Sequence, residues 1–111
     1  RADDTIIRGG ENIAPAEIES VIEQMPGVAQ VAVTGLPSDE WGQQIGAFVV
    51  PRRGAQLSAE QVRDFARVRL RSSKTPDTVV FVTELPHTAT GKLLRRELVR
   101  LASGPAVPSA E

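Results

Sequence analysis

Three short valine-rich segments constrain the fold of this chain more than any other feature of the sequence. They read VAQVAVTGL at residues 28–36, QIGAFVV at residues 44–50 and TVVFV at residues 78–82. β-Branched residues are enriched in strands, and valines that recur with a period of two suit a strand with a buried face. The loop PSDEWG separates the first two segments, and Pro51 and the turn at Arg53-Gly54 end the second. We therefore predict a small sheet built from these strands.

Helical patterns lie on both sides of these segments. Residues 15–25 begin with a proline, which suits a first helical turn, and carry glutamates near the start. Their apolar stripe has helical spacing and consists of Ile18, Val21, Ile22 and Met25. A last helix is predicted after the third strand, with an apolar side made of Leu93, Leu94, Leu98 and Leu101.

A capping pattern marks the start of the middle helix. Ser58 and Gln61 have the spacing of a capping box, and Leu57 and Val62 are placed to form a hydrophobic staple across it. This helix is predicted to continue to about Arg71. Its apolar face consists of Val62, Phe65, Ala66 and Leu70.

An N-terminal hairpin completes the predicted architecture. Residues 5–13, TIIRGGENI, read as two short extended pieces around Gly9-Gly10, and glycine accepts the positive φ of a tight turn without steric cost. The order of elements predicts an α+β domain: a small mixed sheet of about three strands plus this hairpin, packed with about three helices. Residues 102–111 are proline-bearing and small, so they are predicted to be a flexible tail.

Composition excludes several function classes. The 111 residues carry 13 basic and 14 acidic side chains, which argues against a non-specific nucleic-acid binder. The chain has no cysteine and one histidine, so neither a protein metal site nor a Ser-His-Asp triad is expected, and His87 is predicted to be an exposed loop residue. No apolar run approaches a membrane span and no signal peptide is visible, so a cytoplasmic location is expected, with membrane contact at most peripheral.

The segment PHTATGK, residues 86–92, carries the most suggestive local chemistry. It fails as a P-loop, because Pro86 replaces the first glycine and Leu93 stands where Ser or Thr would hold magnesium. Lys92 has two readings from the residues alone. It is either a solvated lysine near a helix start or a cation on a glycine-bearing loop that reaches a phosphate or carboxylate.

The longer segment PHTATGKLLRREL resembles the C-terminal signature of the adenylate-forming enzymes, the superfamily of acyl-CoA synthetases, peptide-synthetase adenylation domains and luciferases. RADDTIIRGGENIAPAEIE, residues 1–19, resembles the segment that opens their small C-terminal domain, and GVAQVAVTGLPSDEWGQQIGAFVV resembles the stretch between. The resemblance runs in order from residue 1 to about 101. IIRGGENIAPAEIE and DEWGQ are most similar to the acyl- or fatty-acid-CoA ligases.

The resemblance implies a two-step reaction. A carboxylic acid attacks the α-phosphate of ATP, giving an acyl-adenylate and pyrophosphate, and the thiol of CoA then displaces AMP. In the superfamily a large N-terminal domain holds most of the ATP and acid sites, and Mg²⁺ is held there or by ATP. The C-terminal domain, residues 1–101 here, rotates between the two steps. The chain begins near the hinge, so it is expected to be an excised domain that is nearly inert alone.

The resemblance also assigns roles to individual residues. Lys92 matches the adenylation lysine, Asp3 falls at the hinge, and Arg1 matches an arginine that approaches the nucleotide ribose. The residues expected to contact CoA are Gly9, Gly10 and Glu11 of a hairpin that lines the pantetheine tunnel, Trp41 near the pantetheine arm, and Arg8 and Lys74 at the phosphates.

Three features leave alternatives open. Some relatives carry an aromatic and further basic residues where this chain has Ser73, Thr75 and Asp77, and an aspartate there would repel a phosphate. PHTATGK also fits the P-x-x-x-x-G-K pattern of lysine acetyltransferase targets among relatives, and acetylation would remove the charge of Lys92. A fatty-acyl-AMP ligase, a peptide-synthetase-type adenylation domain and a non-catalytic interaction module remain as other functions.

Overall fold

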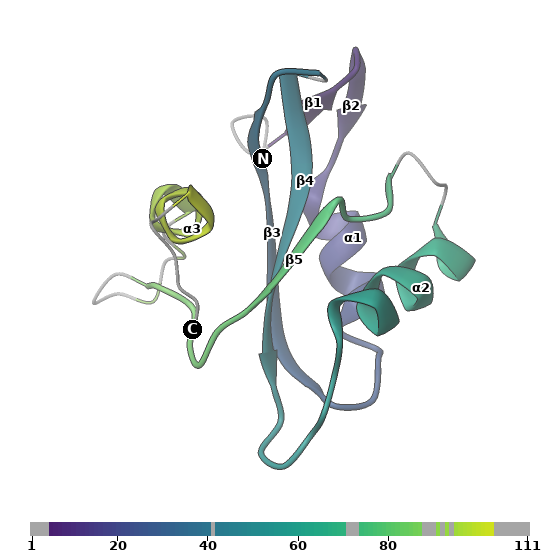
Figure 1. Ribbon diagram of the computed structural model, residues 1–111, viewed down its shortest axis with the longest axis vertical. Helices are drawn as coiled ribbons and strands as arrows, with labels where there is room; N and C mark the ends of the chain where they lie inside the picture. Colours follow the sequence, from purple (N-terminus) through teal and green to yellow (C-terminus); the bar gives the residue numbers. More distant parts are fainter. Residues whose placement is uncertain are drawn as a thin grey trace.

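The chain folds into one mixed sheet with helices on both faces (Figure 1). The computed structural model describes residues 5–40, 42–70, 74–87, 91, 93 and 95–103. The predicted site residues Arg1, Asp3, Trp41 and Lys92 lie outside this part of the chain. Its elements are, in order, β1 (Ile6–Arg8), β2 (Glu11–Ile13), α1 (Pro15–Ile22), β3 (Val28–Ser38), β4 (Gly42–Pro51), α2 (Ala59–Arg69), β5 (Thr78–Phe81) and α3 (Arg95–Ser103).

The sheet has the strand order β2-β1-β4-β3, and β5 lies beside β4. β3 and β4 form a long antiparallel hairpin, whereas β5 runs parallel to β4, with Thr78 opposite Gly46. The N-terminal hairpin joins the same sheet where Arg8 pairs with Gly42. The predicted α+β class and mixed sheet are thus confirmed, and the hairpin is part of a five-stranded sheet rather than an appendage to it.

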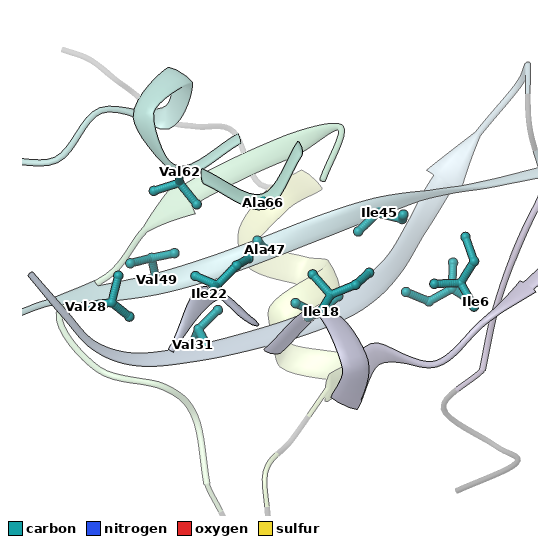
Figure 2. Close-up of a cluster of buried hydrophobic side chains, with 12 residues drawn as sticks. Ile6, Ile18, Ile22, Val28, Val31, Ile45, Ala47, Val49, Val62 and Ala66 are labelled. Carbon is teal, nitrogen blue, oxygen red and sulfur yellow. The ribbon is translucent and has the colours of Figure 1, made fainter. Parts of the chain in front are cut away.

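The first core lies between one face of the sheet and the helices α1 and α2 (Figure 2). Ile18 and Ile22 are fully buried from α1, and Val62 and Ala66 are fully buried from α2. They meet alternate residues of β3 and β4, because successive side chains of a strand point to opposite faces. Part of each predicted stripe therefore closes this core, and Met25 and Leu70 pack against it, whereas Val21 and Phe65 do not belong to it. The first helix ends at Ile22, before the predicted end at residue 25.

A second, smaller core covers the opposite face of the sheet. Phe48 and Leu98 are fully buried there, so α3 packs against the face that α1 and α2 leave uncovered (Figure 1). This explains why residues 45–49 of β4 are apolar almost without interruption: both faces of the strand are covered. None of the helices in the described part of the chain combines the length and apolar character that a membrane span requires.

The middle helix begins as predicted. The Ser58 hydroxyl accepts a hydrogen bond from the Gln61 backbone N–H at 3.1 Å, and the Gln61 carboxamide oxygen accepts one from the Ser58 N–H at 2.8 Å. Leu57 packs against the first core, which also contains Val62. The predicted end at about Arg71 was too late, because α2 ends at Arg69 and Leu70 is already extended.

The last helix differs from its prediction in two ways. It begins at Arg95, so Leu93 precedes it and instead forms an isolated antiparallel bridge with His87. Leu101 does not join the core, since it is 52% exposed, whereas Leu98 is fully buried. Leu94 lies outside the described residues. The helix continues to Ser103, two residues past the predicted limit of the folded domain.

Candidate functional site

The N-terminal hairpin presents an exposed double-glycine turn on a rigid base. Ile6 and Ile13 face each other across the hairpin and are both fully buried in the first core. Gly9 and Gly10 are exposed and have φ values of +58° and +88°, the left-handed region that a two-residue hairpin turn requires. Apart from its chain neighbours, no atom of the described residues lies within 4 Å of the place of a Cβ on Gly10. Gly10 therefore provides the positive φ that the turn requires and leaves open space at the tip of the hairpin.

Arg8, directly before this turn, is engaged with Asp77. The guanidinium donates from Nη2 to Asp77 Oδ1 at 2.9 Å and from Nε to Asp77 Oδ2 at 3.1 Å, a side-on bidentate pair. The side chains are 17% and 23% exposed. The hydrogen bond to Asp77 raises the pKa of Arg8 above its already high ordinary value, so the guanidinium is charged at physiological pH. Asp77, which the sequence suggested would repel a phosphate, is thus the ion-pair partner of Arg8, one of the two predicted phosphate ligands.

Lys74, the second predicted phosphate ligand, lies elsewhere on the domain. Its Nζ is 2.8 Å from Glu17 Oε1, which links the segment before β5 to the first turn of α1. Glu11, also predicted to face CoA, pairs with Arg8 across the hairpin and is half-buried. Among the described candidates, the structure brings together Arg8, Gly9, Gly10 and Glu11 in one hairpin. The two predicted phosphate ligands each face a carboxylate.

The loop that carries the signature lysine is closed at its base. His87 and Leu93 form an antiparallel bridge, and His87 Nδ1 lies 2.9 Å from the backbone carbonyl oxygen of Leu85, which is buried in the second core. His87 is exposed, as predicted. Gly91 is exposed and has a φ of +89°, a conformation that glycine adopts without steric cost. The base of the loop is therefore anchored at His87 and Leu93, while residues 88–90 and Lys92 lie outside the described residues.

The hairpin and the base of this loop pack on opposite faces of the sheet. Ile6 and Ile13 of the hairpin lie in the first core, whereas Leu85 and Leu93 belong to the second core. β5 starts opposite Gly46, on the side of β4 where Arg8 pairs with Gly42, and finishes opposite Val49. The chain then leaves the sheet toward α3, on the other side of the sheet from α1 and α2 (Figure 1). One domain thus presents two separate candidate surfaces, one at the double-glycine turn and one at the loop before α3.

Two polar residues that hold the hairpin were not identified from the sequence. Gln43 accepts a hydrogen bond from the Ile7 backbone N–H at its side-chain Oε1, at 2.8 Å, and Asp77 pairs with Arg8. Their partners are 36 and 69 positions away along the chain, so no local pattern signals the contacts. Within the described residues, no group of three or more His, Cys, Asp or Glu side chains is placed to hold a metal ion.

Comparisons with known proteins agree with this arrangement. Residues 17–92 match the family described as AMP-binding enzyme C-terminal domain. The chain is 48% identical over 101 residues to the 2-succinylbenzoate–CoA ligase of Geobacillus kaustophilus, covering 91% of this chain and 21% of that protein. It is 46% identical over 104 residues to the 4-chlorobenzoate–CoA ligase of a Pseudomonas species, covering 93% and 20%.

Solved structures give the same result. The chain superimposes on the fatty acyl CoA synthetase of Mycobacterium tuberculosis with a TM-score of 0.84 and 44% sequence identity, covering 90% of this chain and 20% of that one. The chain spans about one fifth of the length of the curated relatives it matches. With more than half of its residues inside the family match and with this fold, the chain belongs to the AMP-binding enzyme C-terminal domain family.

Proposed function

We propose that this domain is the C-terminal part of an AMP-forming acid–CoA ligase. The observation that carries the proposal is the exposed turn at Gly9-Gly10, which leaves open space beside Gly10 for a narrow ligand such as the pantetheine arm of CoA. The relatives named as CoA ligases support it, because they match nine tenths of this chain. The domain would act with a large N-terminal domain and would be nearly inactive alone.

In the first step the carboxylate of the acid attacks the α-phosphorus of ATP, and the bond to the leaving pyrophosphate breaks. Negative charge develops on the α-phosphate oxygens and on the attacking oxygen. The ammonium of Lys92 would stabilise that charge, and the bridge between His87 and Leu93 would anchor the base of its loop. Arg1 would approach the ribose, and Mg²⁺ would be held by ATP or by the large domain.

In the second step the thiol of CoA loses its proton and its sulfur attacks the acyl carbon, and AMP leaves with the bonding electrons. The hairpin would face the reaction in this step, with Gly9, Gly10, Glu11 and Trp41 beside the pantetheine arm. The hairpin contributes to the first core and the base of the lysine loop to the second, so the two surfaces belong to opposite faces of the sheet and would not meet one active site together. A rotation of the domain about Asp3 would exchange them.

The proposed acid is a fatty acid, as for the named fatty acyl CoA synthetase relative. Relatives named for 2-succinylbenzoate and 4-chlorobenzoate make aryl acids the alternative class. The test is an ATP–pyrophosphate exchange screen of the full-length protein with fatty acids of graded length and with aryl acids, followed by a thioester assay with CoA. Acid-dependent exchange without any thioester would contradict a CoA ligase, and no exchange with any acid would favour a non-catalytic module.

One observation favours a second acceptor. The described candidates for the CoA phosphates, Arg8 and Lys74, each face a carboxylate. Pantetheine on a carrier protein has no 3′-phosphoadenosine and would use the same open turn, as in a peptide-synthetase-type enzyme. Competition for the acyl group between CoA and a carrier protein that bears a pantetheine arm with a free thiol measures which acceptor this enzyme prefers.

We also propose that acetylation of Lys92 by a lysine acetyltransferase switches adenylation off, because it removes the ammonium charge. An acetylated full-length enzyme that formed acyl-adenylate at the normal rate would contradict this. The full-length protein is proposed to act in the cytoplasm.

A further inference from the structure

We propose that Arg8 and Asp77 form a positioning pair that fixes the Gly9-Gly10 turn for thioester formation, and that Arg8 is not a phosphate ligand. The inference rests on the proposed function, because it assigns the pair to the second step of that reaction. It concerns the place where the N-terminal hairpin meets the sheet. Three parts of the chain converge there: the end of β1, the start of β4 and the residue before β5.

The edge of β4 changes partner at this place. Gly42 pairs with Arg8 of β1 in the antiparallel sense, and from Gly46 onward the same strand pairs with β5 in the parallel sense. The hydrogen-bond pattern between β1 and β4 cannot extend into the pattern between β4 and β5, because antiparallel and parallel strand pairs space their hydrogen bonds differently. The backbone of Ile45, between them, therefore needs partners from outside a regular ladder.

Asp77 supplies those partners and reaches the hairpin at the same time. Its backbone N–H donates to the carbonyl oxygen of Ile45 at 2.9 Å, and its Oδ2 accepts from the Ile45 N–H at 2.7 Å. The same carboxylate accepts both hydrogen bonds from Arg8. Asp77 thus fills the gap in the sheet edge with its backbone and its side chain, and the side chain also holds the residue that precedes the turn.

Two other contacts among the described residues also hold the hairpin to the sheet. Ile7 donates its N–H to the side chain of Gln43, and the buried pair Ile6 and Ile13 anchors the opposite end of the hairpin. Arg8 is the last residue before the turn, so its fixed guanidinium limits how far Gly9 can move relative to β4. A displacement of about 1 Å of a group that positions the substrate can reduce the reaction rate by about a hundredfold.

Charge and burial argue against a phosphate on Arg8. A phosphate that bound this guanidinium would lie beside the Asp77 carboxylate, which already accepts hydrogen bonds from Nε and Nη2, and the two anions would repel each other. The pair is also more shielded than an ordinary surface pair, with side chains 17% and 23% exposed, against 56% and 55% for Arg67 and Asp64 on α2. A bidentate contact in such a setting is stronger than an exposed one.

The experiment separates the two half-reactions in the full-length ligase. Four variants are compared with wild type: Arg8→Met, Arg8→Lys, Asp77→Asn and the double variant Arg8→Met with Asp77→Asn. Arg67→Met is the matched control, because it removes an arginine from an exposed ion pair on α2. Pyrophosphate exchange reports the first step and also shows that each variant is folded. Thioester formation from preformed acyl-adenylate, at varied CoA, reports kcat and KM for the second step.

The positioning role predicts that Arg8→Met and Asp77→Asn each lower kcat for thioester formation by about tenfold, with KM for CoA within about twofold of wild type. Because the two residues act as one unit, the double variant should lose no more than either single variant. Arg8→Lys keeps the charge but not the side-on geometry, so it should also lose kcat. Pyrophosphate exchange should fall much less in every variant, and Arg67→Met should match wild type.

A phosphate-binding role for Arg8 predicts the opposite pattern and would overturn the proposal. Arg8→Met would then raise KM for CoA at unchanged kcat, Asp77→Asn would lower KM by freeing the guanidinium, and Arg8→Lys would stay near wild type. Equal loss of both half-reactions would also overturn it, because it would indicate a general fault in folding. A wild-type enzyme that exchanged pyrophosphate but formed no thioester would refute the proposed function, and the inference with it.

Discussion

The side chain of Leu36 on β3 lies over Gly46 on β4, in the space that a Cβ atom on Gly46 would occupy. Leu36 is buried there beside Phe48, in the core that α3 covers. The glycine therefore allows the leucine to lie flat on the sheet at a point where another residue would push it away. Its backbone does not have the positive φ of the turn glycines.

Substitution of Gly46 by alanine should consequently destabilise the chain. The added methyl group would lie within 2.8 Å of Leu36 Cγ, and overpacking of a core costs about 1–3 kcal/mol. Urea denaturation measures the change. In a Leu36→Ala background the same substitution should cost less, because the side chain that it displaces is gone. An undiminished penalty in that background would locate the strain elsewhere.

Leu98 and Leu101 of α3 should respond differently to truncation. Leu98 is fully buried in the second core, so Leu98→Ala should cost about 2–5 kcal/mol by loss of burial and formation of a cavity. Leu101 is 52% exposed, so Leu101→Ala should change the free energy of unfolding by less than about 0.5 kcal/mol. Thermal melts of the two variants make the comparison. Similar losses would mean that α3 does not bury one face as described.

Gly10→Ala should separate a structural cost from a functional one. Gly10 and Gly54 both have positive φ, at +88° and +81°, and for both the described residues leave the Cβ position open. Either alanine should destabilise the chain by about 1 kcal/mol, through backbone strain alone. In the full-length ligase, Gly10→Ala should also slow thioester formation, because it narrows the proposed pantetheine channel. Gly54→Ala, in the turn before α2, should not; an equal loss of thioester formation in both variants would contradict the channel.

Lys92→Ala in the full-length enzyme should act mainly on the first half-reaction. Loss of one preorganised charge at a transition state costs about 2.7–4 kcal/mol, or roughly a hundred- to a thousandfold in rate. Pyrophosphate exchange should fall by this amount, whereas thioester formation from preformed acyl-adenylate should fall much less. Arg67→Ala serves as the control for removal of a surface charge. Equal loss in both half-reactions would refute the assignment.

Local patterns gave most of the fold in advance. The capping box at Ser58 and Gln61, the glycine turn of the hairpin and the valine-rich strands each depend on residues close together in sequence. The errors arose where a contact from outside replaced a local preference. Leu93 continues an apolar helical pattern, yet its backbone pairs with His87 before the helix begins. Leu101 belongs to the same pattern but is about half exposed, because Leu98, Val99 and Ala102 form the side of α3 that packs against the second core.

The residues of the candidate sites were predicted from the sequence, but the ion pairs that they form were not. The resemblance to the adenylate-forming enzymes suggested a glycine turn for CoA and a lysine loop for ATP, whereas the residues alone left two readings of Lys92 open. They did not indicate that Arg8 and Lys74 would be engaged by Asp77 and Glu17, because ion pairs depend on which segments meet in space. For residues separated by more than a few helical turns, their separation in sequence does not indicate their distance in space.

The sequence by itself determined where strands, turns and caps form, because φ, ψ and side-chain periodicity are set by neighbouring residues. Only the tertiary structure decided that β4 changes partner beside Ile45 and that Asp77 fills the gap while holding Arg8. The physical reason is that a carboxylate exerts its effect over a few ångströms in space. The fold brings together two residues that the chain separates by 69 positions.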